Sequence, residues 1–358
     1  MVGKPTFPLY RLPYVALKVA FGCSHPHDIL RLSMVSKKSY TICKIFRKKV
    51  RNLNVRFDFL SDICSDCMAT IFKVKSNSEV LPEDSKLESL KIKDTEFNVK
   101  MDRCIHILNF YCDDRVTCLT TLYEYLTDFY EVPFHQVELD GDSMTALDGV
   151  LAQQQTLAHC FLRCSKSGDE EVRWFLDRVE NRVTRLLSLD VKTSKNFRLN
   201  LRLNKSIQNF SATTTVMQSI KTDMICFGRS FTLSIDNLSK LHSRGLFAEK
   251  TSLTCENLNS YLKNWQNGGN PNLGSLKLGL KSINVDTVLN GIEFNHRRHQ
   301  NDVAYSATCW FPWNFNESYE IRRNDGTIAS IVMQNGQNGE FKLCVWPDLR
   351  GTVYPESQ

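Results

Sequence analysis

Pro26 divides the first part of the chain into short helical segments. One apolar series with helical spacing begins at Leu12, and a second begins at Ile29. The residue before a proline avoids the helical conformation, so we expect the first helix to end before this point. Ser36 or Ser39 can cap a third helix. Three short helices bury too little surface to be robust alone, so some apolar side chains must pack against the body or a partner.

Basic residues are concentrated in the same segment. Residues 1–56 contain twelve Lys and Arg and a single acidic residue, Asp28, so their formal charge is +11, while the rest of the chain totals −5. A basic head on a slightly acidic body predicts that the head meets an acidic surface. The run from Arg47 to Arg51 lacks the interleaved aromatics typical of nucleic-acid binding, so nucleic acid is the disfavoured partner.

The segment from Leu12 to Cys43 resembles an F-box, the helical adaptor that docks a protein onto the linker subunit of an SCF-type ubiquitin ligase. It departs from the pattern at Val15, where many F-boxes carry Glu, and at the small residues Ala20 and Gly22. An ordinary N-terminal helical cap on a larger domain is the alternative. The resemblance implies that nine residues build the linker-subunit interface or the core beneath it: Leu12, Pro13, Leu17, Pro26, Ile29, Leu30, Leu32, Val35 and Ser36.

Past residue 50, short strands alternate with amphipathic helices. The segment 197–204 alternates apolar and polar residues as a half-buried strand does. Strand-like segments start near 134, 186, 225 and 274, each beside a helix. With the leucine-rich texture at 186–189 and 273–278, this predicts an irregular leucine-rich-repeat-like α/β array, in the α+β or α/β class. A single open α/β sheet is the alternative.

The C-terminal part has a different pattern. Asp325-Gly326 separates two strand-like segments and predicts a hairpin, and further Asn-Gly turns predict an antiparallel β meander. We therefore expect four regions along the chain: an F-box (1–50), connecting strands, loop and helix (51–130), the repeat-like α/β domain (131–295) and a β-hairpin region (296–358).

The string LTCENLNSYLKNWQNGGNPNLGSLKL resembles the F-box-associated type 2 domain, found in a large family of nematode F-box proteins. The resemblance places that domain at about residues 205–280. It rests on Leu258, Asn259, Tyr261, Leu262, Trp265, Gly268 or Gly269, Asn272 and Leu273. Together the two resemblances imply a substrate receptor whose F-box binds the linker subunit, and through it a cullin, while the body binds an unidentified target protein. The alternative is a free-standing protein-interaction module.

Two sets of residues are candidates for target binding. Arg198 and Arg202 share the polar side of one expected strand, and paired arginines can grip an acidic or phosphorylated group, although a solvated outer face is the alternative. Trp310 and Trp313 lie in an aromatic-rich expected loop of the kind that forms binding spots. We expect the basic string at 296–299 to be a solvated loop.

No motif for catalysis, cofactor or metal binding stands out. The chain lacks GxGxxG, P-loop, GxSxG and HExxH patterns, so we expect no enzyme activity and no cofactor. Cys64 and Cys67 form a CxxC without a second ligand pair, which argues against zinc. No apolar run approaches the ~20 residues that span a bilayer, and no secretory signal is present, so we expect a cytoplasmic or nuclear protein.

Overall fold

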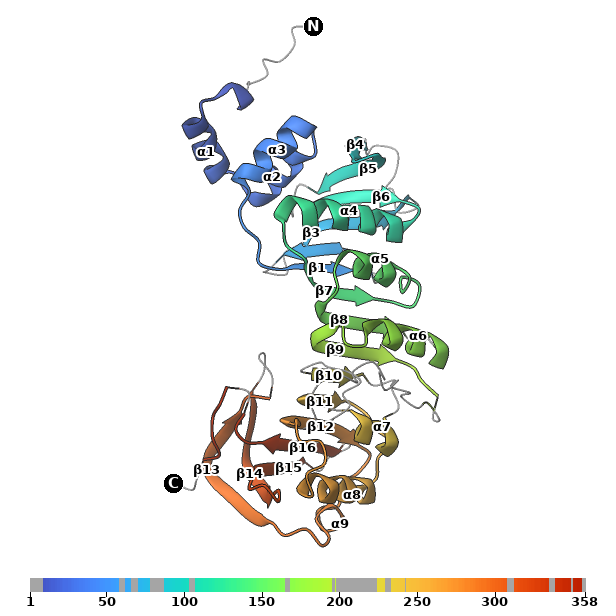
Figure 1. The fold of residues 1–358 in the computed structure, drawn as a ribbon, viewed down its shortest axis with the longest axis vertical. Helices are drawn as coiled ribbons and strands as arrows, with labels where there is room; N and C mark the ends of the chain where they lie inside the picture. Colours follow the sequence, from blue (N-terminus) through green and yellow to red (C-terminus); the bar gives the residue numbers. More distant parts are fainter. Residues whose placement is uncertain are drawn as a thin grey trace, which may run out of the picture. The chain divides into compact units, whose positions relative to one another are not determined.

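The computed structural model shows a mixed α/β protein with a helical N-terminal region (Figure 1). The chain forms two compact units, Met1–Leu139 with Thr145–Gln154, and Asp140–Met144 with Gln155–Gln358. The residues that the structure describes are 9–57, 62–65, 70–77, 87–102, 107–164, 168–194, 197, 224–228, 233–241, 243–307, 312–334, 339–348 and 350–355. No helix within these ranges is long and apolar enough to cross a membrane.

Short helices open the first unit. They are a 3-10 turn η1 (Leu9–Arg11), α1 (Tyr14–Cys23), α2 (Pro26–Ser33) and α3 (Lys37–Phe46). Helix α2 begins with Pro26, at a position where the missing N–H has no helical partner to lose. Helix α3 is capped by Ser36, whose side-chain oxygen accepts a hydrogen bond from the Ser39 N–H at 3.1 Å. The proline break and the serine cap therefore set the boundaries that the sequence predicts.

The rest of the first unit is a mixed sheet with helices. Its elements are β1 (Leu53–Arg56), β2 (Asp62–Ser65), β3 (Thr70–Ser76), β4 (Glu88–Ile92), β5 (Thr95–Asp102), β6 (Ile107–Cys112), α4 (Arg115–Tyr130), β7 (Phe134–Leu139) and α5 (Ala146–Gln153). The strand order is β7-β1-β2-β3-β6-β5-β4, with β1–β7 and β3–β6 parallel. Helix α4 places Leu122, Leu126 and Phe129 in the core, as its apolar spacing predicts.

The second unit begins with parallel strands that follow one another in chain order. Its elements are β8 (Leu157–Cys164), α6 (Asp169–Val179), β9 (Val183–Val191), β10 (Met224–Phe227), α7 (Ile235–Lys240), β11 (Gly245–Ala248), α8 (Cys255–Gln266), β12 (Ser275–Leu280) and α9 (Val285–Val288). Strands β8 to β12 are neighbours in the sheet, with α6, α7 and α8 beside them (Figure 1). The leucine-rich-repeat-like regularity of this array stays a prediction.

Helix α8 and strand β12 show why the sequence folds in this way. Thr254 and Asn257 form reciprocal hydrogen bonds that cap α8, and Trp265 on its apolar side is fully buried. In β12, a Cβ atom on Gly279 would clash with the Glu249 carbonyl oxygen. Only glycine allows this close approach between neighbouring segments.

An antiparallel meander completes the second unit. Its strands are β13 (Asn295–Tyr305), β14 (Trp313–Arg322), β15 (Ile328–Gln334) and β16 (Gly339–Val345), and β16 pairs antiparallel with β12. The predicted hairpin lies between β14 and β15, where Gly326 has a φ of +90° in the turn. The hairpin expected at Asp325-Gly326 is therefore formed by β14 and β15.

Several expectations for the strands differ from the structure. The basic string at 296–299 is not a loop but part of β13, because pairing with β14 holds these polar residues extended. No local sequence pattern predicts strands β2, β4, β5, β6, β8 and β11. The strand predicted at 197–204 lies outside the described residues, apart from the buried Phe197.

Candidate functional site

The N-terminal helices contact helix α4 of the same unit. The hydroxyl oxygens of Ser33 in α2 and Tyr125 in α4 lie 2.6 Å apart, and both residues are buried. The aromatic ring of Tyr40 in α3 packs edge-on against Tyr125 and also contacts Phe129. The sequence predicts that these short helices are not robust alone and must pack against another surface. One such surface is helix α4 of the same chain.

Charges reinforce this contact. Lys44 Nζ lies 3.2 Å from Asp128 Oδ1 and 3.3 Å from Glu131 Oε1, and Arg47 Nη2 lies 2.7 Å from Glu131 Oε2. The Tyr40 hydroxyl donates to Asp128, and this bond together with Lys44 lowers the pKa of Asp128 below its ordinary value. Part of the positive charge of the head is thus balanced by carboxylates of α4 and its end.

The nine residues marked by the resemblance divide between core and surface. Ile29 and Leu30 are 2 % and 1 % exposed, and Leu17 is also buried. Leu12, Pro26 and Leu32 are half-buried, while Pro13, Val35 and Ser36 are exposed. Leu17, Ile29 and Leu30 therefore lie in the core of the helical region, and the other six residues contribute to its surface.

The exposed apolar side chains of the same helices are the functional candidates that sequence reasoning missed. Tyr14, Val15 and Val19 of α1 are 63 %, 73 % and 61 % exposed, and Ile45 of α3 is 64 % exposed. Outside this helical region, the described large apolar residues with comparable exposure are few. The signal was present in the sequence, because α1 is apolar around most of its circumference and so short a helix cannot bury every side.

Lysines accompany these apolar residues. Lys18 of α1 and both Lys37 and Lys38 in the first turn of α3 are exposed, and they form no ion pair among the described residues. A helical region that exposes both apolar side chains and ammonium groups suits a partner with apolar patches and acidic side chains.

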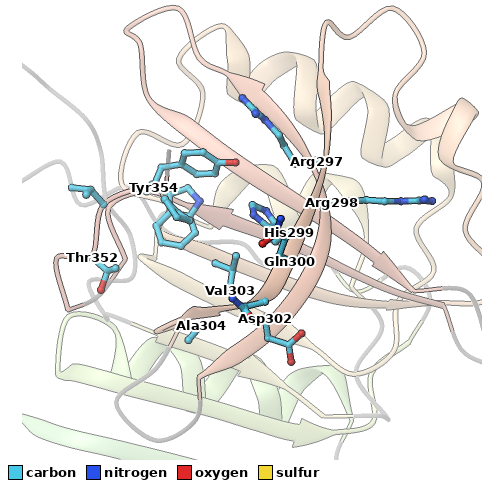
Figure 2. Close-up of a pocket in the computed structure, with 13 residues that line it drawn as sticks. Arg297, Arg298, His299, Gln300, Asp302, Val303, Ala304, Thr352 and Tyr354 are labelled. Atoms are coloured by element: carbon cyan, nitrogen blue, oxygen red, sulfur yellow. The ribbon is translucent and has the colours of Figure 1, made fainter. Parts of the chain in front are cut away.

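A separate cavity lies in the second unit. It has a volume of about 560 Å³ and is lined by residues 297–304 of β13, by Trp346 and by the C-terminal segment 352–355 (Figure 2). Arg297 Nε donates to the carboxylate of Glu320 in β14 at 2.8 Å. The Nε2 atom of His299 is buried and has no hydrogen-bond partner among the described residues.

The predicted target-binding residues are only partly described. Arg198, Arg202 and Trp310 lie outside the described residues. Trp313 is the first residue of β14 and half-buried, with its ring 5.4 Å from that of Phe247 and 5.9 Å from that of Tyr305. It therefore packs against the core of the meander and does not line the cavity, so its role in binding stays a prediction.

No arrangement for metal binding appears in the described part of the chain, where no three His, Cys, Asp or Glu side chains cluster. The cysteines whose side chains the structure describes are free thiols, and burial raises the pKa of Cys43 to about 11. Cys64 lies in β2 and its partner in the CxxC, Cys67, lies outside the described residues.

Comparison with known families decides the nature of the N-terminal helices. Residues 9–51 match the F-box domain. This match spans η1, α1, α2 and α3, so the contact with α4 joins the F-box to the body. F-box domains generally bind the linker subunit of SCF ligases and, through it, a cullin.

A second family model, described as F-box associated, matches residues 207–278. Its described part contains β10, α7, β11, α8 and the first residues of β12. Proteins with F-box and F-box-associated domains are typically non-enzymatic adaptors, and neither match is to a catalytic family. The narrower resemblance to nematode members stays a prediction. No curated protein and no solved structure matches the chain.

Proposed function

We propose that the chain is a substrate-recognition adaptor of an SCF-type ubiquitin ligase. In this role the F-box docks to the linker subunit, which connects it to a cullin, and the body binds a target protein. The two family matches, in the order F-box then F-box associated, support this assignment. The adaptor performs no covalent step, because holding the target near the ubiquitin donor raises the effective concentration of the target lysine.

One observation carries the proposal beyond the family matches. The F-box core is already closed, with Ile29 and Leu30 buried, yet Val15 and Val19 on α1 remain exposed. Exposed apolar side chains that are gathered on one small region mark protein-interaction sites. Lys37 and Lys38, which are exposed at the start of α3, add positive charge to the same helical region, and an acidic linker surface would recognise this charge.

The test is binding of the full chain to the purified linker subunit of an SCF ligase. The variant carries Val15→Glu and Val19→Glu, which place carboxylates on the exposed apolar face. The matched control is Val353→Glu, because Val353 is an equally exposed valine, at 71 %, in the second unit. We expect wild type and control to bind alike and the double variant to bind at least about tenfold more weakly.

Two outcomes would contradict the proposal: a folded wild-type chain that does not bind the linker subunit, or a double variant that binds as well as wild type. In the first case the F-box would serve the second candidate function, a free-standing protein-interaction module. That candidate is favoured by the contact of Ser33 and Lys44 with α4, which shows that the helices already have an intrachain partner.

A further inference from the structure

The cavity of the second unit is preformed by hydrogen bonds to one carboxylate. Asp348 is 2 % exposed, and its Oδ2 atom accepts from the Ser306 N–H at 3.0 Å. Its Oδ1 atom accepts from the N–H groups of Arg350 and Thr352 at 2.9 and 2.8 Å. These bonds hold the C-terminal segment in a turn that brings Tyr354 against Trp346, with ring centres 5.7 Å apart. This side of the cavity is therefore ordered before a ligand binds, so binding does not have to offset the entropy of ordering it.

Two side chains of β13 with nitrogen atoms unpartnered in the described part of the chain lie on the cavity side. Figure 2 shows Arg297 and His299 on the same side of the strand as Tyr354, whereas Arg298 points the opposite way. The bond from Arg297 to Glu320 uses only the Nε atom, so both Nη atoms are without partners among the described residues. The buried Nε2 atom of His299 also lacks one there.

A buried ring nitrogen without a partner is costly. Such a group has given up its hydrogen bond to water without gaining another in the folded chain. In the tautomer that carries the proton on Nε2, His299 would donate to an acceptor oxygen of a ligand and recover this cost, and a second oxygen of the same group would accept from Arg297. A carboxylate has two such oxygens in one plane.

The cationic groups that face the cavity suit a ligand with at most one negative charge. Of the two arginines in its lining, only Arg297 faces the cavity, because Arg298 points away and lies beside Glu317, and Asp302 is the carboxylate of the lining. Glu320, whose side chain is 8 % exposed, already occupies the Nε edge of Arg297. A phosphate with nearly two negative charges would need more cationic donors than this remaining edge provides, whereas a carboxylate would not.

The wall of the cavity is also the edge of a sheet. Among the described strands, β13 is hydrogen-bonded only to β14, so its other edge has backbone groups free to pair. An extended peptide segment can add to such an edge and direct alternate side chains toward one face.

From this geometry we propose that the cavity beside β13 binds an acidic side chain, Asp or Glu, of an extended segment of the target protein. The inference deepens the proposed adaptor function and rests on it only for the identity of the ligand as a target protein. His299 and Arg297 supply the hydrogen bonds, and the aromatic rings of Trp346 and Tyr354 enclose the aliphatic part of the side chain.

The test is selection of a random-peptide display library on the full chain. We expect the selected peptides to share one position enriched in Asp or Glu. A representative labelled peptide, measured by fluorescence anisotropy, should lose about tenfold in affinity when that residue is replaced by Gln. Absence of acidic enrichment overturns the proposal, and tighter binding of a phosphoserine counterpart overturns the assignment to a carboxylate.

Matched variants locate the binding site. His299→Phe keeps an aromatic ring and removes the donor, so it should weaken the representative peptide about tenfold. The control is His296→Phe, on the same strand but outside the cavity, where Nε2 contacts Glu317 at 2.6 Å. Equal loss in both variants, or no loss in His299→Phe, overturns the proposal.

A second cavity variant guards against misfolding of the first. Arg297→Gln is combined with Glu320→Gln, so that no buried carboxylate is left unpaired, and it should also weaken peptide binding about tenfold. Unchanged binding overturns the proposal. The Val15→Glu and Val19→Glu variant should bind the peptide normally, so failure of linker binding and failure of peptide binding can be told apart.

Discussion

The hydroxyl groups of Ser33 and Tyr125 are hydrogen-bonded at 2.6 Å and join the F-box to helix α4. The Ser33 hydroxyl also donates to the Leu30 carbonyl at 2.5 Å. Since a serine has one hydroxyl proton, Tyr125 must be the donor to Ser33. Burial raises the pKa of Tyr125, which keeps this proton in place at any ordinary pH.

This order of donors predicts unequal costs for the two single variants. Ser33→Ala leaves the Tyr125 hydroxyl buried without its acceptor and should destabilise the first unit by about 1–3 kcal/mol. Tyr125→Phe leaves Ser33 bonded to Leu30 and should cost less, about 1 kcal/mol. Urea denaturation of both variants and of the double variant measures the difference. A double variant as costly as the sum of the single ones would contradict this coupling.

Leu30→Asp and Val15→Glu should separate folding from binding. Leu30 is 1 % exposed, so an aspartate there buries a charge without a partner and should destabilise the first unit by about 3 kcal/mol or more. Val15 is exposed, so Val15→Glu should change stability by less than about 0.5 kcal/mol. Thermal denaturation of both variants checks this. A stable Leu30→Asp chain would show that α2 is not part of a closed core.

The C-terminal turn should lose stability in acid. Burial acts to raise the pKa of Asp348, but the backbone N–H groups that bond to it outweigh this effect and hold the pKa below its ordinary value. A depressed pKa gives stability that is present above the unfolded value of about 4 and is lost as the pH falls through the folded value.

Asp348→Asn should therefore destabilise the second unit by about 1–3 kcal/mol at neutral pH, because an amide cannot accept hydrogen bonds at both terminal atoms. The difference from wild type should shrink as the pH falls below about 4. Urea denaturation at several pH values measures it. A difference that is the same at neutral and acidic pH would argue against the carboxylate as the cause.

Two glycines should respond to alanine in opposite directions. Gly279→Ala places a Cβ against the Glu249 carbonyl oxygen and should destabilise the second unit by about 1–3 kcal/mol. Gly22 is in the exposed part of α1 with no atom within 4 Å of the added Cβ, so Gly22→Ala should stabilise the F-box by about 0.5–1 kcal/mol. Chemical denaturation compares them, and a neutral Gly279→Ala would mean that β12 can shift away from Glu249.

Local signals predicted the elements that have their own caps and periodicity. Helix α8 carries a Thr254 cap and a regular apolar stripe, and the β14–β15 hairpin has Asp325-Gly326 at its turn. Strand β13 could not be predicted in this way, because its polar residues become a strand only through pairing, as between Arg297 and Ser318. Long-range pairing of this kind leaves no pattern in a local window.

The candidate site residues were less predictable from the sequence than the helices and strands. The resemblance marked Leu30 and Val35 alike, but the first is buried and the second is 69 % exposed, and this depends on how the helices pack. The resemblance gives Val15 only as a departure from the F-box pattern, yet its exposed side chain makes it a candidate for contact with a partner. The cavity joins β13 to a segment near Tyr354, and that meeting depends on the turn at Asp348 rather than on either string alone.

Helix α4 lies after the F-box match in the sequence, yet the F-box packs against it. The contacts come from Tyr125, Asp128 and the neighbouring Glu131. A chimaera that grafts residues 9–51 onto another scaffold would leave Ser33 and Lys44 facing water instead of these partners. The F-box of this protein therefore cannot be exchanged as an independent module. Any transplant, whether by a designer or by recombination of gene segments, has to carry the strands that hold α4 as well.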